Sequence, residues 1–294
     1  MKFFVPGKTF LVGEYAVLLG GVSLGVATKP YFEFDLVDDN DSRDVVKFHP
    51  ESPAGKYLSR HNQLAKIIFN DKYAEKSVLG GFGRSTAEYF AAMTPDLLKN
   101  KKSFFDILKE YRSLNEDKKL KPSGMDLAFQ FFGGVTLADQ ALNFYQSFDW
   151  NFANLDFYLV STGIKVQTHD HLAELELSII QDLPPLSNQI ANLYAENKEE
   201  EFLYMLRQWC DLLAAKGLTH ENSISLKQRL EKNHEIELVK PCGALGADVL
   251  IIFFKKENLD SVNNILANNK IAALSSSQDL SAGFATQLRQ YWGK

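Results

Sequence analysis

Strand-like and helix-like patterns follow one another irregularly along this chain of 294 residues. Residues 29–37 (KPYFEFDLV) alternate between apolar and polar side chains, which is typical of a half-buried strand, and residues 155–161 also have a strand pattern. Residues 171–233 have mostly helical patterns, and the almost entirely apolar residues 248–254 again indicate a strand. A regular βαβ period is absent, so the sequence predicts an α+β fold with a domain boundary between residues 150 and 170.

The same patterns predict further elements. One helix is expected over residues 59–69 and another over residues 85–93, and Pro95 is expected to end or restart the second one. A third helix is expected to begin at Ser103, where Asp106 completes an S-x-x-D capping box. The other predicted elements are strands at 2–5, 9–12, 45–48 and 236–239 and a helix from about residue 259 to residue 268.

Composition and charge argue against several classes of protein. The net charge of -5 argues against a basic face for nucleic acid, so no nucleic-acid partner is expected. No apolar run approaches the roughly 18 residues that span a bilayer, so no membrane association is expected. The two cysteines, Cys210 and Cys242, do not make a disulfide framework, which favours a reducing, cytoplasmic location.

Residues 80–88 read GGFGRSTAE and place three glycines before an arginine and a helix-like run. The spacing does not fit a Walker motif, and Thr86 stands where a Rossmann motif needs glycine. Glycines still let the backbone approach an anion closely, and free N–H groups at the start of a helix attract phosphate. Arg84 could add a charge-assisted hydrogen bond, and the Ser85 hydroxyl could ligate magnesium. A phosphate-binding loop and a plain helix entry both remain open.

Three other segments carry candidate functional residues, each with a purely structural alternative. In residues 6–21 (PGKTFLVGEYAVLLGG), Lys8 lies in a turn and could be an ordinary surface lysine. In residues 122–126 (PSGMD), Asp126 could cap a helix or act as a catalytic base. Residues 240–248 (KPCGALGAD) form a second glycine loop, which could also be a long hairpin turn.

Taken together and in this order, the four segments resemble the GHMP kinases, a superfamily named for galactokinase, homoserine kinase, mevalonate kinase and phosphomevalonate kinase. The resemblance covers most of the chain, from residue 6 to residue 248. The first glycine motif departs from the usual G-L-G-S-S-A of that family. Phe82 replaces the leucine and Arg84 replaces the first serine, whereas Ser85 matches the second serine.

The resemblance implies a two-domain α+β fold. Residues 1–165 would form an ATP-binding and catalytic domain like domain 2 of ribosomal protein S5, and residues 166–294 would form a ferredoxin-like domain. The resemblance further implies ATP and Mg²⁺ as cofactors and transfer of the γ-phosphoryl group to a small molecule. Such transfer depends mostly on positioning and on neutralising the charge of the phosphoryl oxygens.

Matching the motifs implies a role for several residues. Asp126 corresponds to the family's catalytic aspartate, which would take the proton of the acceptor hydroxyl or orient that hydroxyl. Lys8 corresponds to the lysine beside it, which would hold Asp126 ionised and face the developing charge. Ser85 corresponds to a serine that ligates magnesium, and either Glu116 or Asn115 falls near the place of the glutamate that often supplies a second ligand.

The resemblance also implies two sets of binding residues. The expected nucleotide-binding residues are Gly81, Gly83, Arg84, Ser85, Thr86, Gly243 and Gly246. The expected acceptor-binding residues are Glu14, Tyr15, Lys165, Thr168 and Lys240.

The expected acceptor is a mevalonate-type compound of isoprenoid biosynthesis. Glu14 followed by Tyr15, together with the KPCGALGAD loop, is more similar to phosphomevalonate kinases than to mevalonate kinases, so phosphomevalonate is expected before mevalonate. One alternative is a mevalonate kinase, and a second is a catalytically silent member that senses a small molecule. The chain is expected to act as a monomer or a homodimer.

Overall fold

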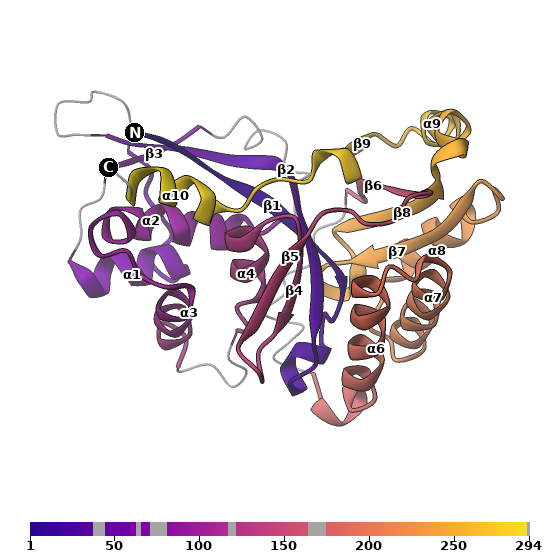
Figure 1. The fold of residues 1–294 in the computed structure, drawn as a ribbon, viewed down its shortest axis with the longest axis horizontal. Helices are drawn as coiled ribbons and strands as arrows, with labels where there is room; N and C mark the ends of the chain where they lie inside the picture. The colour runs from indigo at the N-terminus through magenta and orange to yellow at the C-terminus, as the bar shows by residue number, and fades with distance from the viewer. Residues whose placement is uncertain (38–44, 63–65, 71–80, 117–121, 164–174, 293–294) are drawn as a thin grey trace.

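Two antiparallel sheets lie side by side, and each is packed against helices (Figure 1). The chain builds the first sheet, crosses to the second, and returns to the first with its last helix, so the two termini lie near each other (Figure 1). Within the part of the chain described here, no helix is long and apolar enough to cross a membrane. The computed structural model describes residues 1–37, 45–62, 66–70, 81–116, 122–163 and 175–292.

The first sheet contains the N-terminal motif. Its first strand is one continuous element rather than the two short strands expected, and its register with the second strand shifts between Pro6 and Gly7. Gly7 suits this shift, because a Cβ there would lie 2.9 Å from the carbonyl oxygen of Pro30. The strands are β1 (Lys2–Val12), β2 (Ser23–Leu36), β3 (Ile67–Phe69), β4 (Val135–Asp139) and β5 (Phe144–Phe148), in the order β1-β2-β4-β5 with β3 paired to β2.

Five helices pack on this sheet or on one another. The capping box predicted at Ser103 is confirmed, because its hydroxyl accepts from the Asp106 N–H and the Asp106 carboxylate accepts from the Ser103 N–H. The helices are α1 (Pro53–His61), α2 (Arg84–Asn100), α3 (Phe104–Ser113), α4 (Met125–Phe132) and α10 (Phe284–Trp292), and the 3₁₀ turn η1 (Ala16–Leu19) follows β1.

Two expectations for this half were wrong, the first because strand pairing overrides the local pattern. The helix expected over residues 59–69 ends at His61, and residues 67–69 instead form β3, where Phe69 pairs with Phe34 of β2. The strand expected over residues 45–48 does not form.

Pro95 does not end the second predicted helix, which continues to Asn100. An interior proline costs a helix roughly 3 kcal/mol or more. Phe90 before it and Leu97 after it are both fully buried, so packing on both sides of Pro95 offsets that cost.

The second sheet confirms the ferredoxin-like arrangement. Its chain order is β-α-β-β-α-β, with several helices at the first crossover, and its strand order is β7-β8-β6-β9. The strands are β6 (Leu155–Ser161), β7 (Ile236–Cys242), β8 (Val249–Lys255) and β9 (Ala273–Ser276). The helices are α6 (Leu183–Ala195), α7 (Glu199–Ala215), α8 (Glu221–Leu230) and α9 (Leu259–Asn268), with short 3₁₀ turns at Leu177–Ile180, Ala244–Gly246, Lys256–Asn258 and Ser277–Asp279.

Strand β8 is buried on both faces, which explains its almost entirely apolar sequence. Ile251 and Phe253 pack into the main core with residues of α6 and α7. Ile252 and Phe254 point the other way, into a second core that includes Val262 of α9. Figure 1 shows α6 and α7 below this sheet and α9 at its other side.

The expected division of the chain at residue 165 stays a prediction. In space the two halves do not follow one cut in the sequence. Strand β6 precedes residue 165 yet pairs with β8 and β9 of the second sheet. Helix α10 comes last in the chain yet packs against α2, α4 and β1 of the first half (Figure 1).

Candidate active site

Lys8 and Asp126 form an ion pair between β1 and the start of α4. The Lys8 Nζ lies 3.1 Å from the Asp126 Oδ1, and the side chains are 8% and 36% exposed. Asp126 stands in the first turn of α4, but the N-cap residue is Gly124 and no side chain caps this helix. The carboxylate therefore faces the lysine at the surface, and the helix-capping alternative does not describe it.

The PSGMD turn is held in place by residues outside any motif. A Cβ on Gly124, which has a φ of +77°, would lie 2.1 Å from the Leu108 Cδ1, so this position needs glycine. The Ser123 carbonyl accepts hydrogen bonds from the Arg112 Nη2 and the Gln140 Nε2, both at 2.8 Å. These contacts fix the turn that directs Asp126, and sequence patterns gave no signal for Arg112 or Gln140.

The first glycine segment lies directly beside Lys8. The Lys8 N–H donates to the Phe82 carbonyl at 3.0 Å. Gly83 is the N-cap residue of α2, and a Cβ there would come within 3.0 Å of both the Lys8 Cγ and the Gln130 Nε2. Segments that are far apart in the sequence thus meet at one place: β1, the start of α2 and the start of α4.

Gln130 joins these three segments from the inside. This fully buried side chain donates from Nε2 to the Pro6 carbonyl at 2.9 Å and to the Gly83 carbonyl at 3.1 Å. Its Oε1 accepts from the Thr86 hydroxyl at 2.6 Å, so that hydroxyl is engaged within the protein. A glutamine in the otherwise apolar run AFQFF was an available signal that sequence reasoning missed.

Helices α2 and α4 both begin without a side-chain cap at the N-cap residue, which leaves backbone N–H groups for an anion, although the Met125 N–H of α4 donates to the Ser123 Oγ at 3.4 Å. Ser85 and Arg84 are exposed in the first turn of α2, and the Arg84 Nε lies 2.9 Å from the Glu88 Oε1. Together with the nearby Lys8 ammonium, this arrangement fits the phosphates of a nucleotide.

The two glycine segments meet at Asp248. A Cβ on Gly81 would lie 2.7 Å from the Asp248 Cβ, and one on Gly243 would lie 2.7 Å from the Asp248 Oδ2. Gly246 is also constrained, since a Cβ there would lie 2.6 Å from the Pro241 Cβ. The second segment is the β7–β8 hairpin, as its structural alternative predicted, and it lies against the first segment.

Glu14, Tyr15 and Lys240, expected to bind the acceptor, form a buried link between the two halves. The fully buried Lys240 ammonium is paired with Glu14, and the Tyr15 hydroxyl accepts from the Leu245 N–H at 3.1 Å. Burial raises the pKa of Tyr15 to about 12. Burial alone would lower the pKa of Lys240, but neighbouring Cys242 and Glu14 outweigh it and raise that pKa above its ordinary value. Lys165 and Thr168 lie outside the described residues.

The described residues contain no group of three or more His, Cys, Asp or Glu side chains arranged to hold a metal ion. Asn115 is buried and its amide donates to the Tyr111 carbonyl at 3.2 Å, whereas Glu116 is exposed. An exposed serine and a single carboxylate suit Mg²⁺, which commonly takes one or two protein ligands and completes its shell with phosphate oxygens and water.

A cavity of about 820 Å³ lies beside the PSGMD turn, bounded by η1, α3 and the β4–β5 turn. Ser123, Glu116 and Arg112 are among its lining residues. Leu108 also lines the cavity and touches Gly124, so the cavity adjoins the start of the helix that carries Asp126. Its volume is adequate for a small-molecule acceptor.

Comparison with known proteins finds solved structures with a similar fold. No protein-family model and no curated protein matches the sequence. A Streptococcus pneumoniae phosphomevalonate kinase in complex with phosphomevalonate and AMPPNP is similar, with a TM-score of 0.72, 16% identity and coverage of 94% of this chain and 99% of that one. An L. major mevalonate kinase in complex with R-mevalonate has a TM-score of 0.66 and 13% identity, with coverage of 94% of this chain and 95% of that one. A Lactococcus lactis galactokinase complexed with galactose has a TM-score of 0.68 and 12% identity, with coverage of 96% of this chain and 94% of that one.

All three are named as kinases of small molecules, and each shares its fold with this chain over at least 94% of both chains. This chain has the fold of the GHMP kinases, as its sequence predicted. At these identities the likeness establishes the fold, and the chemistry has to be argued from the site.

Proposed function

We propose that this protein is an ATP-dependent kinase that phosphorylates a mevalonate-type acceptor. The observation that carries the proposal is the Lys8–Asp126 ion pair, placed between the uncapped starts of α2 and α4. A paired lysine and carboxylate at a place suited to phosphates supports phosphoryl transfer rather than a silent sensor. The AMPPNP named with the phosphomevalonate kinase supports ATP as the donor.

Each part of the site would have a defined role. Backbone N–H groups of residues 81–86 would bind the nucleotide phosphates, and Lys8 would neutralise charge on the transferred group. Ser85 and Glu116 are the candidate ligands that would hold Mg²⁺, which would supply positive charge to neutralise the phosphates. Asp126 would orient the attacking oxygen of the acceptor and, where that oxygen belongs to a hydroxyl group, take its proton.

The acceptor can be identified by a coupled ATP-consumption assay with Mg²⁺. We expect turnover with phosphomevalonate, whose phosphate oxygen would attack, and less with mevalonate, whose hydroxyl would attack. Galactose and homoserine serve as controls. Preference for mevalonate would favour the mevalonate kinase alternative. Turnover only with galactose or homoserine would reject the mevalonate-type acceptor, and no turnover despite AMPPNP binding would favour a sensor.

Arg84→Ser tests the departure in the glycine segment, because it restores the serine usual in the GHMP kinases. If Arg84 binds a nucleotide phosphate, its loss should weaken AMPPNP binding by about 10- to 100-fold, the usual worth of a charged hydrogen bond. Calorimetric titration with AMPPNP measures this. Glu88→Gln is the matched control, since it removes the carboxylate partner of Arg84 and leaves the arginine in place. Unchanged affinity in Arg84→Ser would show that the arginine does not bind the nucleotide phosphates.

A further inference from the structure

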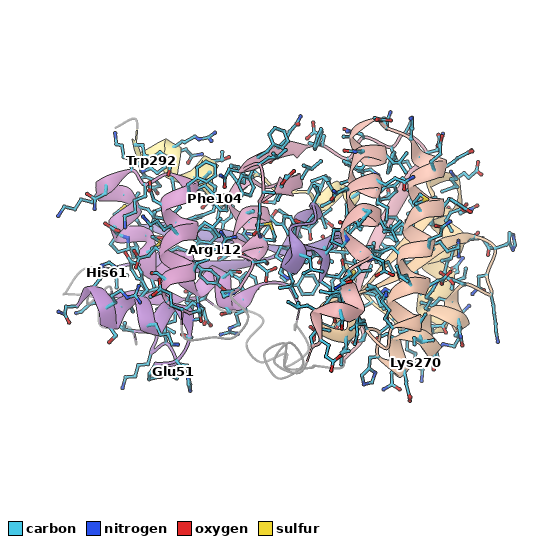
Figure 2. The ribbon with its side chains drawn as sticks, turned by 90° about the horizontal axis from the view of Figure 1, so that it is seen from below. Glu51, His61, Phe104, Arg112, Lys270 and Trp292 are labelled. Atoms are coloured by element: carbon cyan, nitrogen blue, oxygen red, sulfur yellow. The ribbon has the colours of Figure 1, made fainter. Side chains whose placement is uncertain are left out.

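The cavity beside the PSGMD turn contains a half-buried arginine that no carboxylate of the described residues neutralises. Among the described residues Arg112 forms no ion pair, and Figure 2 shows it on the lower face of the molecule. Nearby cations behave differently: Arg60 lies 3.6 Å from the Glu110 carboxylate, and Lys102 pairs with Asp96. A desolvated charge without a counter-ion is costly, so an anion bound in the cavity would stabilise the Arg112 guanidinium.

The guanidinium is held rigidly, with donors to spare. Its Nη2 donates to the Ser123 carbonyl at 2.8 Å and to the Gln140 Oε1 at 2.7 Å. A guanidinium has five N–H donors. The donors on Nη1 and Nε have no protein acceptor within the described part of the chain. Burial lowers the pKa of Arg112, as expected for a cation that the protein solvates less well than water does.

Bracing the turn does not by itself explain a charged residue here. The Gln140 Nε2 donates to the same Ser123 carbonyl at 2.8 Å, so a neutral side chain already provides that contact. Lys109, one turn earlier on α3, lines the same cavity, and it too has no ion pair among the described residues. Among the described residues that line the cavity, Glu116 is the single acidic one, against two cations.

We propose that Arg112, assisted by Lys109, binds an anionic group of the phosphoryl acceptor in this cavity. The substrate would then be a carboxylate- or phosphate-bearing compound rather than a neutral sugar. The inference rests on the proposed function for the identity of the acceptor. It does not rely on Lys240, which the structure buries against Glu14.

Calorimetric titration of the nucleotide-free protein tests this directly. For Arg112→Gln we expect affinity for an anionic acceptor to fall by about 10- to 100-fold. The salt dependence of binding should also become shallower, because one charge is lost. A loss with both mevalonate and phosphomevalonate assigns the carboxylate as the bound group. A loss with phosphomevalonate alone assigns the phosphate. Galactose is the neutral probe.

Two variants separate anion binding from bracing. Gln140→Leu removes a donor to Ser123 but no charge, so a smaller loss with an unchanged salt dependence is expected. Lys2→Gln removes one exposed positive charge from β1, far along the chain from the cavity, and controls for net charge. Melting temperatures identify any variant that has lost its fold. If the positive charge of Arg112 binds the acceptor, Arg112→Lys should bind it more tightly than Arg112→Gln does.

Several results would overturn the inference. If Arg112→Gln and Gln140→Leu lose the same acceptor affinity and show the same salt dependence of binding, Arg112 only supports the PSGMD turn. Failure of the wild type to bind either acid at millimolar concentration, or binding of galactose that Arg112→Gln leaves unchanged, would reject the anion site. AMPPNP is titrated separately. Failure of the wild type to bind AMPPNP would reject the kinase proposal. The titrations of the nucleotide-free protein with the two acids would still test whether Arg112 binds an anion.

Discussion

Replacing Asp126 by asparagine is expected to slow phosphoryl transfer by about 10²–10⁴-fold, the usual contribution of a general base. Asparagine keeps the shape of the side chain but cannot take a proton or pair ionically with Lys8, which lies 3.1 Å away. The loss should be larger with mevalonate, whose hydroxyl must give up a proton, than with phosphomevalonate, whose phosphate is largely ionised at neutral pH. Steady-state turnover at saturating ATP measures both.

Two further measurements make that result specific. AMPPNP affinity and melting temperature should stay near wild type, since Gly124 and not Asp126 occupies the N-cap of α4. Lys8→Met should slow turnover similarly, and the double variant should lose much less than the product of the two, because the residues act as a unit. Near-normal turnover in Asp126→Asn would reject Asp126 as the base.

Local sequence signals predicted the fold well where a helix or strand is determined by residues within one short segment. The capping box of Ser103 and Asp106 set the start of α3, and the apolar run of β8 reflected burial on both faces. The sequence-based prediction was wrong where pairing with a distant segment determines the secondary structure. Residues 67–69 have helical spacing, yet they pair with Phe34, Asp35 and Leu36 of β2.

The site divides in the same way. The resemblance to the GHMP kinases predicted Lys8 beside Asp126, and the two lie 3.1 Å apart, although Lys8 is buried within strand β1 rather than placed in the turn expected at PGK. Arg112 and Gln130 stand in no motif, and their partners, Ser123 and Pro6, are fixed only by the folded arrangement of α3, α4 and β1. Lys240 and Glu14 were expected at the acceptor, since a sequence does not reveal that two motif residues neutralise each other across the two halves.

This buried pair leads to the second large expected effect. Lys240→Met should lower the free energy of unfolding by about 3–5 kcal/mol, because it leaves the Glu14 carboxylate buried without its counter-ion. The remaining oxygen, Oε2, is itself buried and has no hydrogen-bond partner among the described residues, so nothing nearby replaces the ammonium. Urea unfolding measures the loss. Lys255→Met is the matched control: its partner Glu199 lies at a surface where Lys255 is 27% exposed, and such pairs contribute about 1 kcal/mol or less.

Removing both charges should restore most of that stability. In the Glu14→Leu/Lys240→Met variant neither charge of this pair is left buried without its partner, and replacing a buried ion pair by apolar side chains is often neutral or stabilising. If the pair instead serves the acceptor, Lys240→Met will unfold like the wild type and lose acceptor affinity, and the double variant will not recover it. Measuring urea unfolding and phosphomevalonate binding on the same three proteins separates these outcomes. We expect stability to follow the charge balance, because Lys240 is fully buried and its ammonium is already paired with Glu14.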